Sequence, residues 1–573
     1  MGEYIPPTVV IDEIKFKNGE SLKFKKDDIV LLVGANNVGK SRTLKDIRDD
    51  LYQLDSQKVL IDEIKYSDKG FSEEQMQSFF ERNVSKDDFG NYNISTGYNS
   101  TYSFSKENFR NLSEDSSNEE KRTFYKALFS FLSTENRLDI TKPIIFNYNV
   151  DRNALNILMR LETSDLIETL NEVLISSFKK AIEVYDYYSG ENIIKKYKIG
   201  DEDDIIDAIK SSRRDCNNKL ENAEDLYDQG DGIRNAVAVL ASFITNEHSL
   251  FLIDEPETFL HPPQARTIGK NTVELSTNKQ CFISTHNIDF IRGVLEADPS
   301  RVKIIKIDRI DNVNYFHLVD NEIITEISQD KNLKYTNILN GLFYKQLVLC
   351  EDESDCKLYS AILENVCPET YQNTLFCAVG GKYQFKKVVP LLKELKIQYK
   401  VIADIDLINN KNELKKLLDA IEEGSYDKIK TEHINFLEKF EEGTNSQVKT
   451  QETIKKEISN VFNGDKYMSP VSVSRIKDIL KDATKISALK KSGKSILPSG
   501  ECVKSFENIK DFLKEQEIFI LDCGEIEKLV PTIAGHGDAW IEKVFSEHPN
   551  IEDGVYDEAR KFIEEVFSYD MKD

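Results

Sequence analysis

Two acidic residues follow a short apolar segment near the middle of the chain. Residues 249–253 predict a buried parallel strand that ends at Asp254 and Glu255. Asp254 can hold Mg²⁺ through water and Glu255 can polarise the attacking water, because phosphoryl transfer needs neutralised charge and a positioned nucleophile. A second apolar segment, residues 281–284, ends shortly before His286, which we expect beside the γ-phosphate of a nucleotide. This pattern indicates nucleotide hydrolysis.

A phosphate-binding loop near the N-terminus supports the same chemistry. The apolar residues 29–33 lead directly into Gly-Ala-Asn-Asn-Val-Gly-Lys-Ser, which matches the G-x4-G-K-[ST] pattern in full. Backbone N–H groups of such a loop curl around the β-phosphate, the lysine reaches the β- and γ-oxygens, and the serine ligates Mg²⁺ at a helix start. The residues predicted to contact ATP are Gly34, Asn36, Asn37, Val38, Gly39, Lys40 and Ser41. We expect Ser41 and Asp254 to share the Mg²⁺.

A second glycine-rich turn, at residues 229–234, predicts a further anion site. Gly230, Asp231 and Gly232 lie where a helix that continues through Ala241 would begin, and a helix N-terminus favours phosphate. Because the chain's own phosphate loop already serves one nucleotide, the natural ligand of this turn is ATP on a second copy of the chain. The sequence therefore predicts a two-fold dimer that encloses two ATP molecules.

The C-terminal half carries a different set of carboxylates. Apolar segments at residues 347–350 and 399–403 each predict a buried strand that ends in acidic residues. These residues are Glu351, Asp404 and Asp406, with Asp355 in the helix that follows the first strand. Side chains two apart on an extended backbone point the same way, so the set can meet at one sheet edge. Oxygen ligands of this kind suit Mg²⁺ or Mn²⁺. Acidic strand ends that merely face water are the alternative.

Composition limits the classes of protein that remain. A chain of 573 residues is too long for one hydrophobic core, so we expect two or more domains. The net charge of −24 excludes a basic surface over the whole molecule, so any contact with nucleic acid must be local. Eight cysteines without a C-x-x-C pair predict reduced thiols. The sequence has no apolar stretch of membrane-spanning length and no signal peptide at residues 1–7, so we expect a cytoplasmic protein.

The order of motifs predicts an α/β protein with two domains. The first, residues 1–335, would be a P-loop ATPase domain with a helical insertion at about 151–228. The second, residues 336–573, would be an α/β domain with a helical insertion at about 409–502. Basic residues recur late in that insertion, at Arg475, Lys477, Lys481, Lys485, Lys490, Lys491 and Lys494. They are the best candidates for contacting a phosphate backbone, although a solvated charged face is an equally ordinary explanation.

The motifs of both halves resemble those of one known family. The phosphate loop, the turn at 229–234, the segment 250–262 and the segment 284–287 resemble the Walker A, signature, Walker B and switch-histidine motifs of ABC-type ATPases. The particular subset is the one that contains the overcoming-lysogenization-defect (OLD) family, whose members join such an ATPase to a C-terminal Toprim domain. The acidic set of the second half resembles a Toprim site. This resemblance implies a two-metal nuclease.

The resemblance also assigns roles to residues of the second half. It implies that Glu351 and Asp355 are paired acidic ligands, that Asp404 and Asp406 form the D-x-D pair, and that Glu527 is the late glutamate of the site. A nuclease of this kind needs a cation for the transition state. Lys543, downstream of Glu527 and near Trp540, is the first candidate, and Lys382 is the second. The catalytic set predicted on this basis is Glu255, Glu351, Asp404, Asp406 and Lys543.

The function implied is an ATP-binding, Mg²⁺- or Mn²⁺-dependent endonuclease that cleaves DNA. The resemblance implies a homodimer or higher even oligomer with a role in anti-phage defence, as in Gabija-like or retron-associated systems, where a partner protein or RNA can take part. The order of the domains suggests that the ATPase gates the nuclease. Two alternatives stay open: an ATP-driven clamp or sensor of nucleic acid without cleavage, and a Toprim ribonuclease that acts on RNA such as tRNA.

Overall fold

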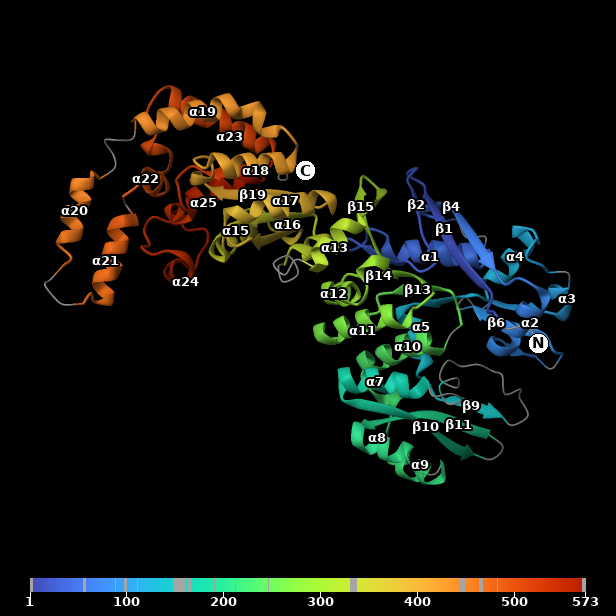
Figure 1. The fold of residues 1–573 in the computed structure, drawn as a ribbon. Coiled ribbons are helices and arrows are strands. Elements are labelled where there is room, and N and C mark those ends of the chain that lie inside the picture. Colours follow the sequence, from blue (N-terminus) through green and yellow to red (C-terminus); the bar gives the residue numbers. More distant parts are fainter. Residues whose placement is uncertain are drawn as a thin grey trace. The chain divides into compact units, whose positions relative to one another are not determined.

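The chain divides into two compact units, Met1–Lys334 and Tyr335–Asp573, called here the N-terminal and C-terminal units (Figure 1). The structure is a computed structural model. It describes residues 4–54, 58–87, 89–96, 100–110, 112–147, 161, 166–189, 192–211, 213–245, 247–329, 337–443, 449–462, 467–481 and 483–568. No helix among these residues is long and apolar enough to cross a membrane.

A six-stranded sheet forms the centre of the N-terminal unit. Its strands, in spatial order, are β16 (Val313–Leu318), β15 (Val302–Ile310), β3 (Ile29–Val33), β14 (Gln280–Ser284), β13 (Leu250–Asp254) and β8 (Phe129–Leu132). All neighbours pair in parallel except β15 and β16, which form a hairpin. β3 is buried along its whole length, as expected for a central parallel strand covered on both faces. The carboxyl ends of β3, β13 and β14 therefore meet at one edge.

Two layers cover this sheet. On one face lie α1 (Lys40–Leu51) and an antiparallel sheet of β2 (Ser21–Lys23), β1 (Thr8–Phe16) and β4 (Ile61–Lys69). Leu32, Leu252 and Phe282 share a hydrophobic core with this layer. On the opposite face lie α10 (Asp231–Thr245), α11 (Pro262–Leu275) and α12 (Ile288–Ala297) (Figure 1). There the rings of Phe243 and Phe251 stack with centroids 4.7 Å apart.

Smaller elements extend the first of these layers. They are α2 (Glu73–Asn83), β5 (Ser85–Lys86), β6 (Tyr92–Thr96), β7 (Ser100–Phe104), α3 (Lys106–Phe109) and α4 (Asn118–Tyr125), whereas α5 (Thr134–Ile140) packs against α10 on the opposite face. Phe80, Tyr92, Phe104 and Phe124 from four of these elements pack edge to face or stacked in one cluster. Aromatic burial of this kind holds short, loop-rich elements against the main sheet.

The insertion at 151–228 differs from the prediction. Its described part has the helices α7 (Leu166–Phe178), α8 (Glu202–Ile209) and α9 (Arg213–Leu220), together with the strands β10 (Lys180–Ser189), β11 (Asn192–Asp201) and β12 (Glu224–Asp225). β9 (Ile144–Asn147) also pairs with β11. The prediction of a wholly helical insertion is wrong for 180–201. Aromatic and β-branched residues favour strands, and Val184, Tyr197 and Ile199 are buried on the hairpin. Residues 151–160 lie outside the described part.

The C-terminal unit is built on a parallel sheet in the order β18 (Thr374–Ala378), β17 (Gln346–Cys350), β19 (Gln398–Asp404) and β20 (Ile518–Leu521). One face packs against α15 (Glu353–Val366), α24 (Gly537–Glu547) and α25 (Asp557–Val566), whose apolar residues share a core with Val348 and Ile402. α17 (Phe385–Glu394) and α23 (Glu501–Glu515) lie on the other face (Figure 1). The acidic strand ends thus share one edge.

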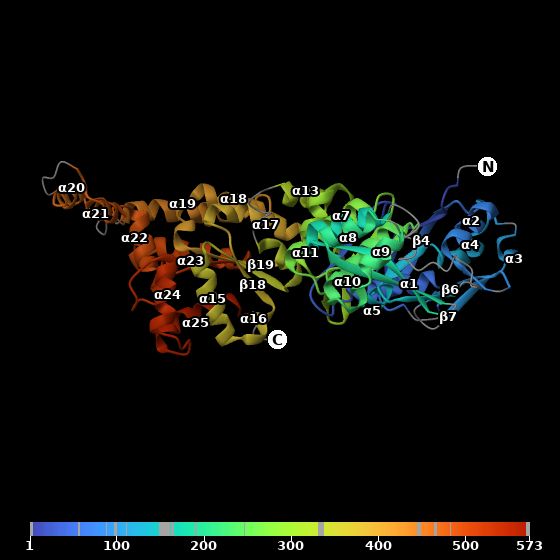
Figure 2. The same ribbon diagram turned by 90° about the horizontal axis from the view of Figure 1, so that it is seen from below.

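The insertion at 409–502 is helical throughout its described part. It contains α18 (Lys411–Ile421), α19 (Ser425–Gly443), α20 (Gln451–Ser459), α21 (Pro470–Lys481) and α22 (Lys485–Ser492). Both views show α20 and α21 farther from the sheet than α18 and α19 (Figures 1 and 2). α22 returns to the sheet, because Lys494 just after it donates its backbone N–H to the carbonyl of Asp522, 2.8 Å away, beyond β20.

Candidate nucleotide and metal sites

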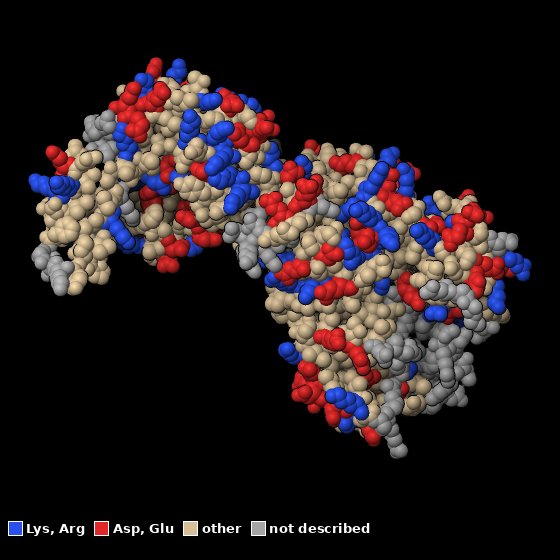
Figure 3. Space-filling model, viewed as in Figure 1, with Lys and Arg blue, Asp and Glu red and all other residues tan. Residues whose placement is uncertain are grey.

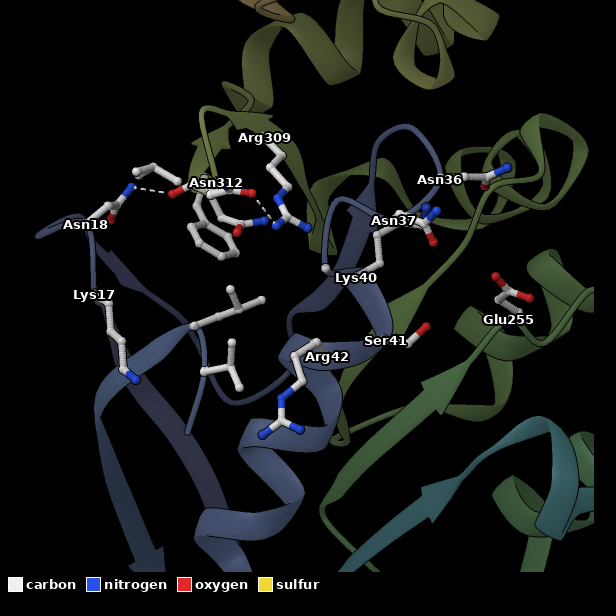
Figure 4. A pocket seen from close by; sticks show the side chains of 16 residues that line it. Lys17, Asn18, Asn36, Asn37, Lys40, Ser41, Arg42, Glu255, Arg309 and Asn312 are labelled. Atoms are coloured by element: carbon white, nitrogen blue, oxygen red, sulfur yellow. Dashed lines mark hydrogen bonds between the residues drawn. The ribbon is translucent and has the colours of Figure 1, made fainter. Parts of the chain in front are cut away.

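A cavity of about 900 Å³ lies at the carboxyl edge of the six-stranded sheet (Figure 4). Its walls at one end carry Asn36, Asn37, Lys40, Ser41 and Glu255. At the other end they carry Lys17, Asn18, Val59, Leu60, Arg309, Asn312 and Phe316. The second group comes from the turn after β1, the approach to β4 and the β15–β16 hairpin. The cavity therefore combines a polar phosphate end with an end that offers both apolar and polar contacts.

The phosphate loop is held in the conformation that its sequence predicts. Gly34 (φ +145°) leaves no room for a side chain, because a Cβ atom there would lie 2.3 Å from the carbonyl oxygen of Ile307. Gly39 precedes α1 with φ +100°, in the left-handed region that glycine tolerates. The Lys40 ammonium donates to the carbonyls of Gly34 and Ala35, each 3.0 Å away, and burial lowers its pKa. The lysine is thus curled over the loop, where phosphate oxygens bind in such motifs.

Two hydroxyl groups converge on Asp254. The Ser41 hydroxyl donates to its Oδ1 at 2.7 Å, and the Ser284 hydroxyl donates to the same oxygen. Ser41 lies in the first turn of α1, Asp254 ends β13 and Ser284 ends β14, so three elements supply the contact. The structure therefore brings together the two residues predicted to share Mg²⁺.

Glu255 and His286 also meet at this edge. The Nδ1 atom of His286 lies 3.2 Å from Oε1 of Glu255. This hydrogen bond lowers the pKa of Glu255 and raises that of His286. Glu255 has φ +50°, a strained conformation for a residue with a side chain. Glu255 and His286, which were predicted from separate segments, therefore contact each other. The backbone is strained at Glu255, the candidate catalytic residue.

Two buried residues that sequence reasoning missed hold this turn in place. Arg137 is fully buried and donates to the backbone carbonyls of Asp254 at 2.6 Å and Glu255 at 2.9 Å. Glu257 is buried and accepts from the Thr285 hydroxyl at 2.8 Å and from the backbone N–H of His286 at 3.1 Å. Burial raises the pKa of Glu257. No spacing in the chain marks Arg137, which follows β8 more than one hundred residues before its partners.

The signature turn lies at the N-terminus of α10. Gly232 has close neighbours, since a Cβ atom there would be 2.6 Å from the carbonyl oxygen of Phe259. Asp231 is paired with Arg234 at 2.9 Å. Gly230, Asp231 and Gly232 are not among the residues that line the nucleotide cavity of their own chain. Their contact with a nucleotide on a second copy stays a prediction.

In the C-terminal unit, Glu351, Asp404 and Asp406 converge as predicted. One ligand oxygen from each lies within 4.8 Å of the others. The backbone N–H of Asp404 donates to Oε1 of Glu351 at 3.3 Å. Asp406 is 5% exposed, and its Oδ1 has no hydrogen-bond partner among the described residues. Burial, followed by repulsion between the carboxylates, raises the pKa of Glu351 and of Asp404. A buried, unpaired oxygen among crowded carboxylates fits a divalent cation.

Asp355 and Glu527 lie beside this cluster. Asp355 accepts from the backbone N–H of Asp352 at 3.0 Å, and burial raises its pKa to about 7, helped by the charges of nearby acidic residues that include Glu351 and Glu527. Glu527 accepts from the backbone N–H of Gly537 at 3.2 Å, and its Oε2 is buried without a partner among the described residues. Glu527 also forms a second potential ligand group with two residues that sequence reasoning missed, Glu525 and His536.

The lysines named from the sequence lie in different surroundings. Lys543 lies on α24, is half-exposed and pairs with Glu547 at 3.9 Å. Two other lysines contact the acidic cluster: Lys382, which pairs with Asp406, and Lys490 on α22, whose Nζ lies 3.2 Å from Oδ2 of Asp404. These ion pairs therefore favour the second candidate, Lys382, over Lys543 by geometry, and a catalytic role for either stays a prediction.

Comparison with known proteins assigns both units. Residues 29–292 match the family model described as "AAA domain, putative AbiEii toxin, Type IV TA system", and residues 342–406 match the model "Overcoming lysogenization defect protein-like, TOPRIM domain". The second match includes Glu351, Asp404 and Asp406 but ends before Lys490 and Glu527. The mixed α/β architecture predicted from the sequence is confirmed.

Two relatives show partial similarity. The chain is 29% identical over 164 residues to endonuclease GajA of Bacillus cereus (strain VD045), covering 28% of this chain and 27% of that protein. It is 24% identical over 172 residues to the Old nuclease of Escherichia phage P2, covering 28% of each chain. The alignments thus span little more than a quarter of either relative. Among solved structures, the SMC head domain from Thermotoga maritima matches 55% of this chain and all of its own, with 12% identity and a TM-score of 0.28.

Proposed function

We propose that this chain, which joins an AAA ATPase domain to an OLD-like TOPRIM domain, is an ATP-binding, divalent-metal-dependent endonuclease that cleaves DNA. The observation that carries the proposal is the convergence of Glu351, Asp404 and Asp406 with an unpaired buried oxygen. Similarity to two nucleases, endonuclease GajA and Old nuclease, supports the same activity. The proposal includes a role in anti-phage defence, which rests on the resemblance of the sequence motifs to the OLD family.

The N-terminal unit binds ATP in the cavity shown in Figure 4. The phosphate loop and Lys40 contact the phosphates, while Ser41 and Asp254 are placed to hold Mg²⁺. Glu255 orients and polarises the attacking water, and His286 holds Glu255 in position through the 3.2 Å contact. Arg137 fixes the backbone that presents both carboxylates.

The C-terminal unit carries the hydrolytic site. Glu351, Asp404 and Asp406 would hold one Mg²⁺ or Mn²⁺, and Asp355 with Glu527 would complete a second position. Divalent ions bound there supply an activated water and neutralise charge on the phosphodiester. Burial, followed by repulsion between the carboxylates, raises the pKa of Glu351 and of Asp404, and a bound cation would relieve that repulsion.

The signature turn supports a homodimer or higher even oligomer. The nucleotide cavity of the same chain is not lined by Gly230, Asp231 or Gly232. We therefore propose that this turn contacts a nucleotide on a second copy. ATP-dependent association of the N-terminal units would then gate the TOPRIM domain. A variant that does not bind ATP tests this link.

The experiment that tests the proposed function is cleavage of supercoiled plasmid in Mg²⁺ or Mn²⁺, with and without ATP. Wild type is expected to nick or linearise the plasmid. The double variant Glu351→Gln, Asp404→Asn should lose this activity, whereas Glu353→Gln, an exposed acid in the first turn of α15, should retain it. Cleavage that persists in the double variant, or no cleavage by wild type under any of these conditions, refutes the proposal.

A further inference from the structure

One lysine of the helical insertion reaches the acidic cluster of the TOPRIM domain. The Nζ atom of Lys490 lies 3.2 Å from Oδ2 of Asp404, 3.5 Å from Oδ2 of Asp406 and 3.9 Å from Oε1 of Glu525. The ammonium of Lys490 therefore faces three carboxylates at this edge of the sheet.

Other basic residues of the same region have partners elsewhere. Lys485, on the same helix, pairs with Glu441 at 2.7 Å. Lys494 pairs with Asp522 at 2.8 Å. Figure 3 shows Lys and Arg interspersed with Asp and Glu over most of the visible face. Within the basic stretch considered for DNA binding, Lys485 and Lys494 thus form ion pairs away from Asp404 and Asp406, whereas Lys490 contacts both carboxylates.

Backbone packing fixes the helix that carries Lys490. Gly524 (φ +110°) lies so close to α22 that a Cβ atom there would be 1.9 Å from the carbonyl oxygen of Lys490. Gly493 (φ +59°) ends α22, and a Cβ atom there would be 2.2 Å from the carbonyl oxygen of Asp522. Leu489 is fully buried. The last turn of α22 is therefore fastened to the loop that also carries Glu525, and a lysine on such a frame is preorganised.

The two lysines at the cluster have different surroundings. The Lys382 side chain is 12% exposed and pairs with Asp406, which is 5% exposed, so this pair has little access to water. The Lys490 side chain is 30% exposed, and the Asp404 side chain it contacts is 23% exposed. The more exposed ammonium, on a flexible stem, can contact a ligand that enters from solvent, whereas the less exposed one neutralises a buried carboxylate.

We propose that Lys490 contacts a non-bridging oxygen of the phosphodiester at the TOPRIM site and stabilises the negative charge that develops during cleavage. This inference rests on the proposed nuclease function. It places the cation on the inserted helix α22, outside the residues that match the TOPRIM family model. A preorganised positive charge at such a position is worth most in the transition state, where charge on the phosphoryl oxygens is redistributed.

The test compares three variants of the full chain. Lys490→Met is expected to reduce plasmid cleavage by about 100-fold or more, the effect typical of removing one transition-state donor, and Lys490→Arg should restore part of the rate. Lys439→Met, at a partly exposed lysine of the same insertion that pairs with Glu442 at 2.9 Å, should cleave like wild type. Cleavage by Lys490→Met at the wild-type rate overturns the inference.

A second measurement separates this inference from the proposed function. Mn²⁺ binding, followed by electron paramagnetic resonance without DNA, should tighten by about tenfold in Lys490→Met, because the variant removes a positive charge a few ångströms from the carboxylates. Lys439→Met should bind Mn²⁺ like wild type. If wild type fails to cleave DNA, the proposed function fails, but the Mn²⁺ measurement still decides whether Lys490 faces the metal site. Unchanged Mn²⁺ affinity in Lys490→Met overturns the inference.

Discussion

Replacing Gly524 by alanine tests whether backbone packing positions Lys490. An ideal Cβ atom at this position would lie 1.9 Å from the carbonyl oxygen of Lys490 and 3.2 Å from the backbone nitrogen of Gly493. Real Cβ contacts essentially never fall below 3.0 Å, so α22 or the loop must move by about 1 Å. The variant therefore displaces the ammonium without removing it.

The loss of stability expected in Gly524→Ala has two parts, and a matched substitution at a second glycine distinguishes them. A positive φ costs alanine about 1–2 kcal/mol relative to glycine, and forced repacking adds about 1–3 kcal/mol. Gly500 has φ +91° and no atom within 4 Å of its ideal Cβ, so Gly500→Ala pays only the first part. Gly524→Ala should thus lower the free energy of unfolding by about 1–3 kcal/mol more than Gly500→Ala.

Urea unfolding of the full chain gives this difference, and hydrogen exchange of α22 locates it. We expect faster exchange over Lys485–Ser492 in Gly524→Ala but not in Gly500→Ala, together with a loss of cleavage only in the former. Equal unfolding free energies for the two variants, with unchanged exchange in α22, would show that the loop and helix are not held by this contact.

Three further predictions concern the N-terminal unit. Lys40→Ala should abolish ATP binding in calorimetry and remove any ATP response of plasmid cleavage, and a retained ATP response would exclude gating. Arg137→Met should lower ATP hydrolysis at least tenfold and destabilise the fold by roughly 1–3 kcal/mol, because two buried carbonyls lose their donor. Arg266→Met, at a partly exposed arginine that pairs with the partly exposed Glu296, should do neither. Burial lowers the pKa of Lys279 to about 8 from an ordinary 10.5, so the unfolded chain binds more protons between these values and stability rises with pH there. Lys279→Met should therefore stabilise the protein at pH 7 by at most about 3 kcal/mol, and the loss of the hydrogen bond from Lys279 to the Phe243 carbonyl subtracts from this gain. Thermal unfolding should show the gain shrinking as the pH approaches 10.5.

Local patterns in the chain predicted the parts of the sites that lie at strand ends. A fully apolar run such as residues 29–33 identifies a central strand, and parallel pairing then brings its carboxyl end beside those of other strands. This is why Ser41 and Asp254, separated by 213 positions, could be expected in contact. The same reasoning placed Glu351 beside Asp404.

The residues that were missed come from elements without a motif. Arg137 donates to backbone carbonyls, which every residue has. The sequence therefore contains no pattern that would identify its partners. In the sequence, nothing distinguishes Lys490 from the other basic residues around it, because the glycine contacts that position α22 are tertiary. Lys543 was favoured through chain proximity to Glu527, but its helix directs it to Glu547 instead. Tertiary packing, which single-sequence patterns do not contain, decided each of these positions.

The charges of the chain limit how it can bind a polyanion. With a net charge of −24 and mixed signs over most of the visible face, long-range attraction cannot concentrate DNA on this protein (Figure 3). Three carboxylates at the TOPRIM site would add to the repulsion if they stood alone. Lys382 and Lys490 offset two of these charges, and divalent cations reverse the sign of what remains. In the proposed nuclease, phosphate affinity would therefore be concentrated at the TOPRIM site, where Lys382 and Lys490 lie, rather than spread over the surface.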